Sequence, residues 1–313
     1  MSGAHLSLGD GREFDAIRAM LEEWGPRATG VGDDAATLEM RAGAELVIST
    51  DASVEGVHFR REWMSASDIG ARAATAALSD LAAMAAAPLG MLLSLVVPER
   101  WQDDLLALAR GVGLSASRAG CPIIGGNLTR GSELSLTITV LGHATHPLRR
   151  AGARIGDRVY VTGQLGGAGA ALRALLAGET PTRAHLSRFV APVARLREAQ
   201  WLGAAGARAG IDISDGLLAD AAHLARASDV TLALGLTSVP LVDGVTTAQA
   251  ATSGEEYELL IAMPKDVAVD VGQFVKSFGI PLTDIGSVQQ AGAEAVLFDD
   301  HAGGLAHGHD HLR

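Results

Sequence analysis

The chain has 313 residues, 48% of them hydrophobic, and a net charge of −11 that results from 25 basic and 36 acidic side chains. This length allows one large domain or two ordinary ones, with a sizeable core. Binding to nucleic acid or to an anionic membrane usually needs a basic face, so the acidic balance argues against both kinds of partner. No apolar stretch is long enough to cross a bilayer without a charge, a glycine or a proline.

Absent signals narrow the class of protein further. The N-terminus lacks a basic segment followed by an apolar one, so we expect no secretory signal peptide. The single cysteine, Cys121, cannot form an internal disulfide, and both features favour a soluble cytoplasmic protein. The strings G-K-[ST], H-R-D and D-F-G do not occur, which excludes a Walker A P-loop and a protein-kinase site.

The first predicted elements lead to a polar stretch after a strand. Periodicity predicts a helix over residues 11–24, and the segment G-V-G-D-D-A-A follows at residues 30–36. The apolar strand 46–48 then runs directly into the hydroxyl and carboxylate groups of Ser49–Asp51. Such groups at the end of a buried strand are costly unless they are paired or exposed. They indicate either a cation or phosphate site or an ordinary strand-to-loop turn.

A second set of elements surrounds Asp80. An Ala-rich helix is predicted over residues 66–86, and Asp80 lies within it between apolar neighbours, where a carboxylate needs a partner. A buried strand over 89–97 and a helix over 101–118 follow. That helix contains G-V-G-L-S-A, which is similar to a dinucleotide-binding fingerprint. Its glycines lie inside a helical pattern, so we reject that interpretation.

The next segment combines glycines with a polar side chain. A short strand that begins at Cys121 is expected to run into G-G-N-L-T-R-G, residues 125–131. The glycines allow backbone to approach a ligand closely, and Asn127 offers an oxygen ligand. Alternation and β-branched residues predict a further strand over residues 133–142.

A domain boundary is predicted near His146, which separates an N-terminal domain over residues 1–146 from a C-terminal domain over residues 147–313. The second domain begins with a basic cluster that includes Arg150. A strand over 159–162 then precedes G-Q-L-G-G-A-G and an Ala- and Leu-rich helix. A strand, a glycine-rich turn and a helix N-terminus suit a phosphate, but the glycines could equally serve close packing.

The stretch I-D-I-S-D-G-L-L-A-D at residues 211–220 repeats the earlier pattern. A short strand presents Asp212, Ser214 and Asp215, a glycine turns the chain, and a helix begins. Together with Asp80 and the earlier stretch, these residues predict a polycarboxylate site. Mg²⁺ prefers oxygen ligands and keeps several waters, so one or two carboxylates hold one ion. This many acidic residues therefore predicts several Mg²⁺ ions.

The last part of the chain adds a glutamate and a histidine-rich tail. The segment S-G-E-E-Y-E-L-L begins with a turn that carries Glu255 and leads into a strand over residues 257–262. A helix is predicted over residues 266–278. His309 is the middle of three alternating histidines in the tail, which indicate either a transition-metal site or a mobile tail.

Taken together and in this order, these motifs resemble those of the bacterial thiamine-monophosphate kinase family. The resemblance covers nearly the whole chain and rests on G-D-D-A-A, S-T-D-x-x-V-E-G-V-H-F, L-S-D-L-A-A-M, G-G-N-x-x-R-G, R-x-G-A-x-x-G-D-x-V-Y-V-T-G, I-D-I-S-D-G-L and S-G-E-E-Y-E-L. That family belongs to the aminoimidazole-ribonucleotide-synthetase-like superfamily of ATP-dependent enzymes. The resemblance implies an α/β (α+β) fold of two domains, an N-terminal sheet that closes a β-barrel across a homodimer, and ATP binding without a P-loop.

The resemblance also implies roles for individual residues. Ligands of Mg²⁺ fall on Asp34, Ser49, Thr50, Asp51, Asp80, Asn127, Asp212 and Asp215. Contacts with ATP fall on Gly126, Asn127, Arg150 and Ser214, and contacts with the substrate fall on His58, Glu255 and His309. Asp51 and Asp215 are expected to matter most, because metal ions and arginine electrostatics replace a catalytic base or nucleophile.

Two positions depart from the family pattern. Asn127 stands where the family usually has aspartate, which keeps an oxygen ligand but removes a charge. The tail reads G-H-D-H-L around His309, where the family usually carries an aromatic residue near the thiamine ring.

The reaction that the resemblance implies moves the γ-phosphoryl group of ATP onto the phosphate of thiamine monophosphate, the last step of thiamine diphosphate biosynthesis. Two alternatives remain open. One is another ATP-dependent synthetase of the same superfamily, although the reactive N-terminal or C-terminal cysteine of two such enzymes is absent here. The other is a catalytically silent regulator that binds metal and nucleotide.

Overall fold

The computed structural model describes residues 11–31 and 35–298, and two compact units divide this part of the chain. The first unit ends at Leu81 and resumes over Ala86–Thr145, whereas Ala82–Ala85 and the chain from His146 onward form the second. The described residues hold ten strands in two sheets and nine α-helices. This mixture confirms the predicted α/β (α+β) fold class.

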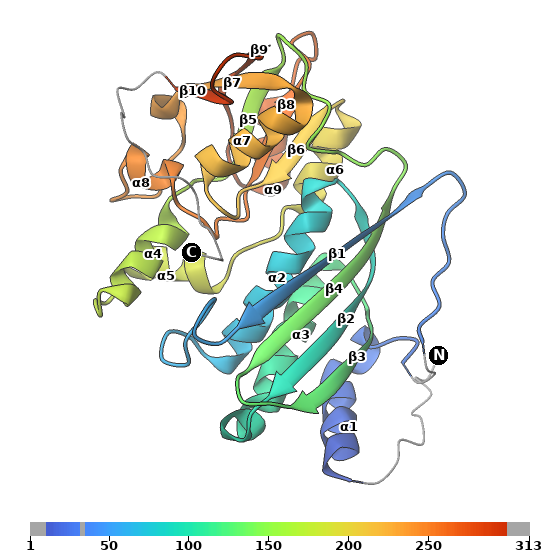
Figure 1. Ribbon diagram of the computed structural model, residues 1–313. Coiled ribbons are helices and arrows are strands. Elements are labelled where there is room, and N and C mark those ends of the chain that lie inside the picture. Colours follow the sequence, from blue (N-terminus) through green and yellow to red (C-terminus); the bar gives the residue numbers. More distant parts are fainter. Residues whose placement is uncertain (1–10, 32–34, 299–313) are drawn as a thin grey trace. The chain divides into compact units, whose positions relative to one another are not determined.

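The first unit is a four-stranded sheet covered on one face by helices (Figure 1). Its strands, in spatial order, are β1 (Glu45–Val54), β4 (Ser135–Ala144), β2 (Ala87–Val97) and β3 (Ile123–Arg130). Its helices are α1 (Arg12–Trp24), η1 (Gly25–Arg27), α2 (Ala66–Ala83, whose end lies in the second unit), η2 (Glu99–Asp104) and α3 (Leu105–Ala119). Only β2 and β3 run parallel; β4 is antiparallel to both of its neighbours.

Strand alternation decides which side chains of this sheet enter the core. On β4, Leu136, Ile138 and Val140 are fully buried, and the residues between them are half-buried. Because successive side chains of a strand point to opposite faces, one face packs on the helices and the other does not. The unit's core therefore lies between the sheet and its helices.

Two glycines set the distance between α2 and α3. A Cβ atom on Gly70 of α2 would lie 2.1 Å from the carbonyl oxygen of Leu108, and one on Gly111 of α3 would lie 1.9 Å from that of Ser67. Each helix thus uses a glycine to admit the backbone of the other. Gly111 belongs to the rejected fingerprint and lies inside α3, as the helical pattern predicted.

Two strands of this unit differ from expectation. The prediction of a buried strand that stops before Ser49 is wrong, because β1 continues to Val54 at an edge of the sheet. The side chains of Leu46 and Ile48 are 47% and 57% exposed. The short strand expected to begin at Cys121 is likewise longer, because β3 continues through the glycine-rich segment to Arg130.

The second unit is built on a six-stranded mixed sheet (Figure 1). The strands, in spatial order, are β10 (Val296–Phe298), β7 (Val230–Leu234), β9 (Leu282–Gln290), β5 (Arg158–Thr162), β8 (Leu259–Met263) and β6 (Ala209–Asp212). The helices are α4 (Gly167–Leu176), α5 (Arg183–Val190), α6 (Leu196–Ala204), α7 (Leu217–Ser228), η3 (Leu236–Ser238), α8 (Thr247–Ala251) and α9 (Val271–Phe278). Every residue of β6 and β8 is buried, although β6 lies at an edge of the sheet.

One helix and one strand of this unit begin later than predicted. Helix α9 begins at Val271 instead of residue 266, because the Asp270 side chain caps it by accepting a hydrogen bond from Gln273 N at 2.8 Å. Strand β8 begins at Leu259, because the backbone at Glu255 and Tyr257 is left-handed, with φ of +64° and +52°. No helix among the described residues is both long and apolar enough to cross a membrane.

Candidate active site

The first group of predicted ligands lies on β1 and α2. The side chains of Ser49 and Asp51 share the helix-facing side of β1, since their partners in the register, Val140 and Ile138, are buried. The Ser49 hydroxyl donates a hydrogen bond to the carboxylate of Asp80 on α2. The structure therefore brings Ser49 and Asp80 together, with Asp51 on the same face of the strand.

Thr50 faces the other way. Its hydroxyl lies 3.0 Å from the hydroxyl of Thr139, its partner in the register on β4, and it is exposed on the side of the sheet opposite the helices. A strand alternates its side chains, so neighbouring hydroxyl groups on β1 cannot all reach one ion through their side chains.

Asn127 and Gly126 lie on β3, at the opposite edge of the sheet from β1. Asn127 pairs with Ser94 and is exposed on the same face as Thr50. Three strand spacings of about 4.8 Å separate the two edges. Gly126 is needed for packing, because a Cβ atom there would lie 2.0 Å from the carbonyl oxygen of Leu93.

His58 lies in a tight turn that follows β1. Gly56, with φ of +83°, turns the chain, and its N–H donates to the Phe59 carbonyl at 2.8 Å. The His58 Nδ1 accepts a hydrogen bond from Val54 N at 3.1 Å, so the neutral ring carries its proton on Nε2. The buried Arg72 of α2 donates to the His58 carbonyl at 3.3 Å.

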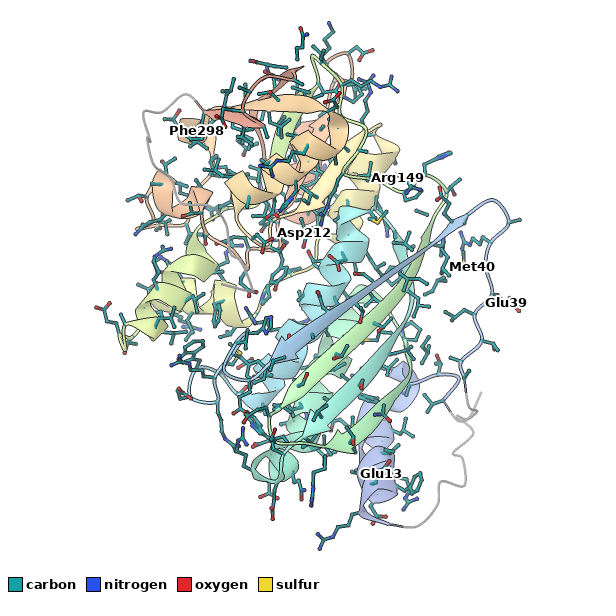
Figure 2. The ribbon with its side chains drawn as sticks, in the orientation of Figure 1. Glu13, Glu39, Met40, Arg149, Asp212 and Phe298 are labelled. Atoms are coloured by element: carbon teal, nitrogen blue, oxygen red, sulfur yellow. The ribbon has the colours of Figure 1, made fainter. Side chains whose placement is uncertain are left out.

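The second group of predicted ligands surrounds the turn between β6 and α7. Asp212 is the last residue of β6 (Figure 2). It is only 4% exposed. Ser214 and Asp215 follow in the turn and are half-buried. Gly216, with φ of +117°, starts the helix. This strand, turn and helix agree with the prediction for residues 211–220.

A carboxylate that sequence reasoning did not single out organises this turn. Asp220 Oδ2 accepts hydrogen bonds from the backbone N–H groups of Ser214, Asp215 and Gly216, at 3.0, 3.0 and 3.1 Å. Burial raises the pKa of Asp220 to about 7, and the nearby carboxylates of Asp212 and Asp215 add to the rise, while the backbone N–H groups oppose it.

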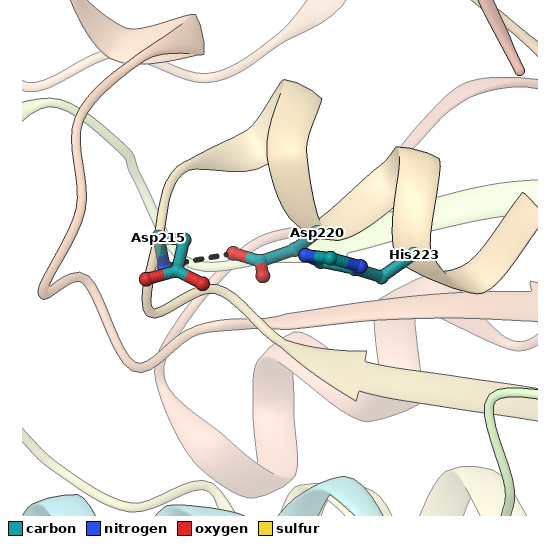
Figure 3. Close-up of side chains that lie close together, drawn as sticks. All are labelled: Asp215, Asp220 and His223. Atoms are coloured by element: carbon teal, nitrogen blue, oxygen red, sulfur yellow. Dashed lines mark hydrogen bonds between the residues drawn. The ribbon is translucent and has the colours of Figure 1, made fainter. Parts of the chain in front are cut away.

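Three ligand atoms meet beside this turn. Oxygen or nitrogen atoms of Asp215, Asp220 and His223 all lie within 4.8 Å of one another (Figure 3). Carboxylate oxygens are the donors that Mg²⁺ prefers, and a cation there would relieve the repulsion from Asp212 and Asp215 that adds to the effect of burial on the Asp220 pKa. The donor set of this turn therefore fits the predicted ion.

The loop of residues 253–258 lies directly against the same turn. The Glu255 N–H donates to the Ser214 carbonyl at 2.8 Å, and the Tyr257 N–H donates to the Ile213 carbonyl at 2.9 Å. The Tyr257 hydroxyl donates to the Glu255 carboxylate. The structure thus brings Glu255, which belongs to a separate motif, to a loop adjacent to Ser214 and Asp215.

The other two glutamates of this loop point into the core. Glu256 accepts hydrogen bonds from Gly166 N at 2.9 Å and from the Ser253 hydroxyl at 2.5 Å. The Ser253 hydroxyl in turn accepts one from Gly169 N at 2.9 Å. Burial raises the pKa of Glu256 to about 7, although these hydrogen bonds oppose the rise.

The N-terminus of α4 is therefore already filled by the protein's own side chains. The suggestion that this glycine-rich turn binds a phosphate is wrong, and its glycines serve close packing instead. A Cβ atom on Gly166 would lie 2.3 Å from Val245, and one on Gly169 would lie 2.2 Å from the Ser253 hydroxyl oxygen.

Glu258 belongs to a buried ion pair. Its carboxylate accepts from Arg195 Nε at 2.8 Å and from a terminal guanidinium nitrogen of the same residue at 2.5 Å, and both residues are buried. The Thr162 hydroxyl donates to it at 2.7 Å and accepts from Leu259 N at 2.8 Å. These contacts join the loop to β5 and to the segment before α6.

The remaining predicted residues divide into one that is described and two that are not. Arg150 is exposed, and its carbonyl accepts a hydrogen bond from the Ser228 hydroxyl at 2.8 Å, which ties its loop to the end of α7. Asp34 and His309 lie outside the described residues.

Sequence reasoning missed Asp220, Glu256 and Glu258, although each lies within a quoted motif. A weak signal existed for Asp220, because an acidic residue in the first turn of a helix often binds backbone N–H groups. No such signal distinguishes Glu256 and Glu258 from Glu255.

Known protein families define the class of protein to which the chain belongs. The model of the AIR synthase related protein N-terminal domain matches residues 32–144, and that of the C-terminal domain matches residues 154–299. The chain is also 34% identical over 294 residues to the thiamine-monophosphate kinase of Salmonella typhimurium, and the match covers 88% of each protein.

Solved structures agree with this class. The crystal structure of thiamine-monophosphate kinase from Stenotrophomonas maltophilia K279a superposes with a TM-score of 0.80 at 34% identity, over 96% of this chain and 98% of that one. The structure of AaThiL complexed with AMPPCP and TMP superposes with a TM-score of 0.76 at 29% identity, over 94% of each chain. The chain belongs to the thiamine-monophosphate kinase family of AIR synthase related proteins.

Proposed function

We propose that this protein is an ATP-dependent kinase that phosphorylates thiamine monophosphate to thiamine diphosphate. The observation that carries the proposal is the family match over most of the chain, together with one relative solved with AMPPCP and TMP. The side-by-side arrangement of Ser214, Asp215 and Glu255 supports it, since a nucleotide contact, a metal ligand and a substrate contact would then adjoin.

The chemistry requires positioning more than activation of a nucleophile. A phosphate monoester has a second pKa of about 6, so the acceptor is largely a dianion near neutral pH. It needs no general base. The difficulty is to bring two polyanions into line, and phosphoryl transfer therefore depends on positioning and on charge stabilisation. This matches an acidic chain with no G-K-[ST] string.

Magnesium is the cation that we assign to the carboxylates. In the first unit, Ser49, Asp51 and Asp80 would hold it on one face of the sheet, and in the second unit Asp212 and Asp215 would do so at the turn. The predicted ligands Asp34 and Asn127 complete the proposed set, whereas the Thr50 side chain, which bonds Thr139 on the opposite face of β1, does not join it. When bound, the ions neutralise phosphate charge and polarise the transferred group.

The side chains have separate tasks in this proposal. The Nε2–H of His58 donates a hydrogen bond to the phosphate of thiamine monophosphate, because the His58 Nδ1 already accepts one from Val54 N. Ser214 and Arg150 contact the phosphates of ATP together with Gly126 and Asn127 on β3. Glu255 binds the substrate, as His309 of the tail does.

The direct test is product formation. The purified protein, incubated with Mg²⁺, ATP and thiamine monophosphate, is expected to form thiamine diphosphate and ADP in equal amounts, measured by chromatography. ATP binding without any product would favour the silent regulator. ADP formation that depends on a different acceptor would favour another synthetase of the superfamily.

We also propose that the protein acts as a homodimer, paired through the sheet face opposite the helices. Leu46 and Ile48 expose apolar side chains on this face of β1, which favours burial against a second copy. Within one chain, Asn127 and Asp51 lie at opposite edges and on opposite faces of the sheet. A second copy could bring the partner's β3 to the first copy's site and close a β-barrel.

Light scattering tests this assembly. The wild-type protein is expected to have twice the mass of one chain, and Ile48→Asp to have the mass of one chain with most activity lost. Leu114→Asp is the matched control, because Leu114 is 40% exposed on α3. An active wild-type monomer would refute the dimer.

We place the protein in the cytoplasm, where its single buried cysteine stays reduced.

A further inference from the structure

Asp220 is a buried carboxylate that occupies an anion site made by one turn. Three consecutive backbone N–H groups, from Ser214 to Gly216, converge on its Oδ2 at 3.0–3.1 Å. The residue is only 2% exposed. Successive N–H groups that point to one position form a concavity that binds anions, and here the anion belongs to the protein itself.

We infer that Asp220 is a positioning residue for phosphoryl transfer, an inference that rests on the proposed function. By accepting all three hydrogen bonds, Asp220 fixes the backbone from which the Ser214 and Asp215 side chains project. The Ser214 carbonyl of the same turn accepts the Glu255 N–H at 2.8 Å. One carboxylate therefore sets the direction of a nucleotide contact, a metal ligand and a substrate contact.

A second consequence concerns the phosphates of ATP. The turn has the glycine, the strand and the helix N-terminus that in other proteins hold a phosphate. Because Asp220 already occupies its N–H groups, a phosphate oxygen cannot bind them. The nucleotide must instead be held there through the Ser214 hydroxyl and the cation bound to Asp215.

A purely structural role would behave differently. Asp220 lies in the first turn of α7, where a carboxylate also stabilises a helix through its dipole. Loss of that effect alone would lower stability and leave substrate and Mg²⁺ affinities unchanged. A positioning role changes the Mg²⁺ and ATP dependence as well, because the partners of metal ligands typically affect affinity or activity by about 10–100-fold.

The kinetic test uses Asp220→Ala, Asp220→Asn and a matched control. Asp220→Ala is expected to raise the Mg²⁺ concentration for half-maximal activity and the KM for ATP by about 10-fold or more. Asp220→Asn keeps an oxygen acceptor and is expected to recover most of the loss. The control is Asp157→Ala, since Asp157 is also buried and accepts Arg154 N at 2.8 Å. It should lower the melting temperature without altering either constant.

A second measurement does not depend on activity. Hydrogen–deuterium exchange should show protected amides at residues 214–216 in the wild-type protein and much faster exchange there in Asp220→Ala. In Asp220→Asn, which keeps an oxygen acceptor and serves as the test if the first variant does not fold, the increase should be smaller but still measurable. Absence of kinase activity with this pattern intact, and with weaker Mg²⁺ and ATP binding in the variant, would refute the proposed function only. The inference itself fails if these amides are unprotected in the wild type. It also fails if Asp220 variants, like Asp157→Ala, change stability alone.

Discussion

Ser49–Asp51 and Asp212–Asp215 share one sequence pattern, an apolar segment followed by hydroxyl and carboxylate groups, but the structure builds them differently. The first lies within a strand, so alternation sends Ser49 and Asp51 to the helices and Thr50 to the opposite face. The second follows the end of a strand, and a turn gathers Ser214 and Asp215 beside Asp220.

The difference shows two ways to hold acidic side chains in place. On β1 the ladder of the sheet fixes the backbone, and a single side-chain bond, from Ser49 to Asp80, joins the strand to α2. At the turn the ladder ends, and the buried carboxylate of Asp220 holds the backbone together with hydrogen bonds from the loop of residues 253–258. We therefore expect the strand to be sensitive to which face a residue occupies, and the turn to be sensitive to its buried supports.

The largest expected effect falls on one carboxylate from each region. Asp51→Ala and Asp215→Ala should each lower kcat by about 10³-fold, equivalent to roughly 4 kcal/mol, because each removes a metal ligand from phosphoryl transfer. Turnover at saturating Mg²⁺ measures the loss, and circular dichroism checks the fold. Asp103→Ala, an exposed carboxylate of η2, serves as the control. Near-normal turnover in either variant would contradict the metal assignment.

The next effect tests the buried supports of the turn. Arg195→Met breaks the buried pair with Glu258 and leaves a carboxylate without its main partner, which should cost about 3 kcal/mol in the free energy of unfolding. Arg158→Met is the matched control, because the side chains of Arg158 and its partner Asp284 are 50% and 29% exposed. Such an exposed pair contributes less than about 1 kcal/mol to stability. Urea unfolding compares them. Equal losses would show that burial of the first pair has no special importance.

A smaller effect concerns the pH dependence of stability. The pKa of Glu256 in the folded protein, about 7, lies above its ordinary value of 4.5. Its contribution to stability is therefore fully present below pH 4.5 and is lost as the pH rises through 7. Glu256→Gln keeps an oxygen acceptor and should stabilise the protein by about 2 kcal/mol at pH 8, and by much less at pH 5.

Thermal melting at the two pH values measures this effect. The exposed Glu179 provides a control in Glu179→Gln, which should leave the melting temperature unchanged at both. If the melting temperature of Glu256→Gln fell between pH 5 and pH 8 by as much as that of the wild type, another group would cause the pH dependence. Asp220 would be the first candidate, because its pKa is raised in the same direction.

The smallest effect compares neighbours on β1. Ser49→Ala removes the hydrogen bond to Asp80 and should lower kcat/KM by about 10-fold, as expected for a bond to a charged group. Thr50→Val removes only the bond to Thr139 on the opposite face, so kcat/KM should stay within about twofold. A larger loss in Thr50→Val than in Ser49→Ala would mean that the opposite face of β1 also carries ligands.

Much of the fold followed from local patterns. Alternation predicted β4, the small residues predicted α2, and the strand–turn–helix pattern predicted the boundary between β6 and α7. The position of β1 at a sheet edge did not follow, because edge or centre depends on which strands pair, and Leu46 and Ile48 are apolar in either case. The length of β3 was missed because its glycines look like a loop until their close approach to Leu93 is known.

The candidate site was predictable as a set of residue types but not as an arrangement. Asp215 and Asp220 are both aspartates, and only the three N–H groups around Asp220 show that its carboxylate supports the turn. The same holds for Glu255, which is half-buried, and for Glu256 and Glu258, which point inward. Such differences depend on contacts between segments far apart in the sequence.

The glycine pair between α2 and α3 extends its influence beyond packing. Gly70 and Gly111 set how deeply α2 sits against α3. Asp80 lies ten residues further along α2, about 15 Å away at 1.5 Å per residue, and it reaches Ser49 from the same rigid rod. An added methyl group at either glycine would push the two helices apart and tilt α2. The position of the Asp80 carboxylate beside Ser49 is therefore set in part at a distant helix crossing.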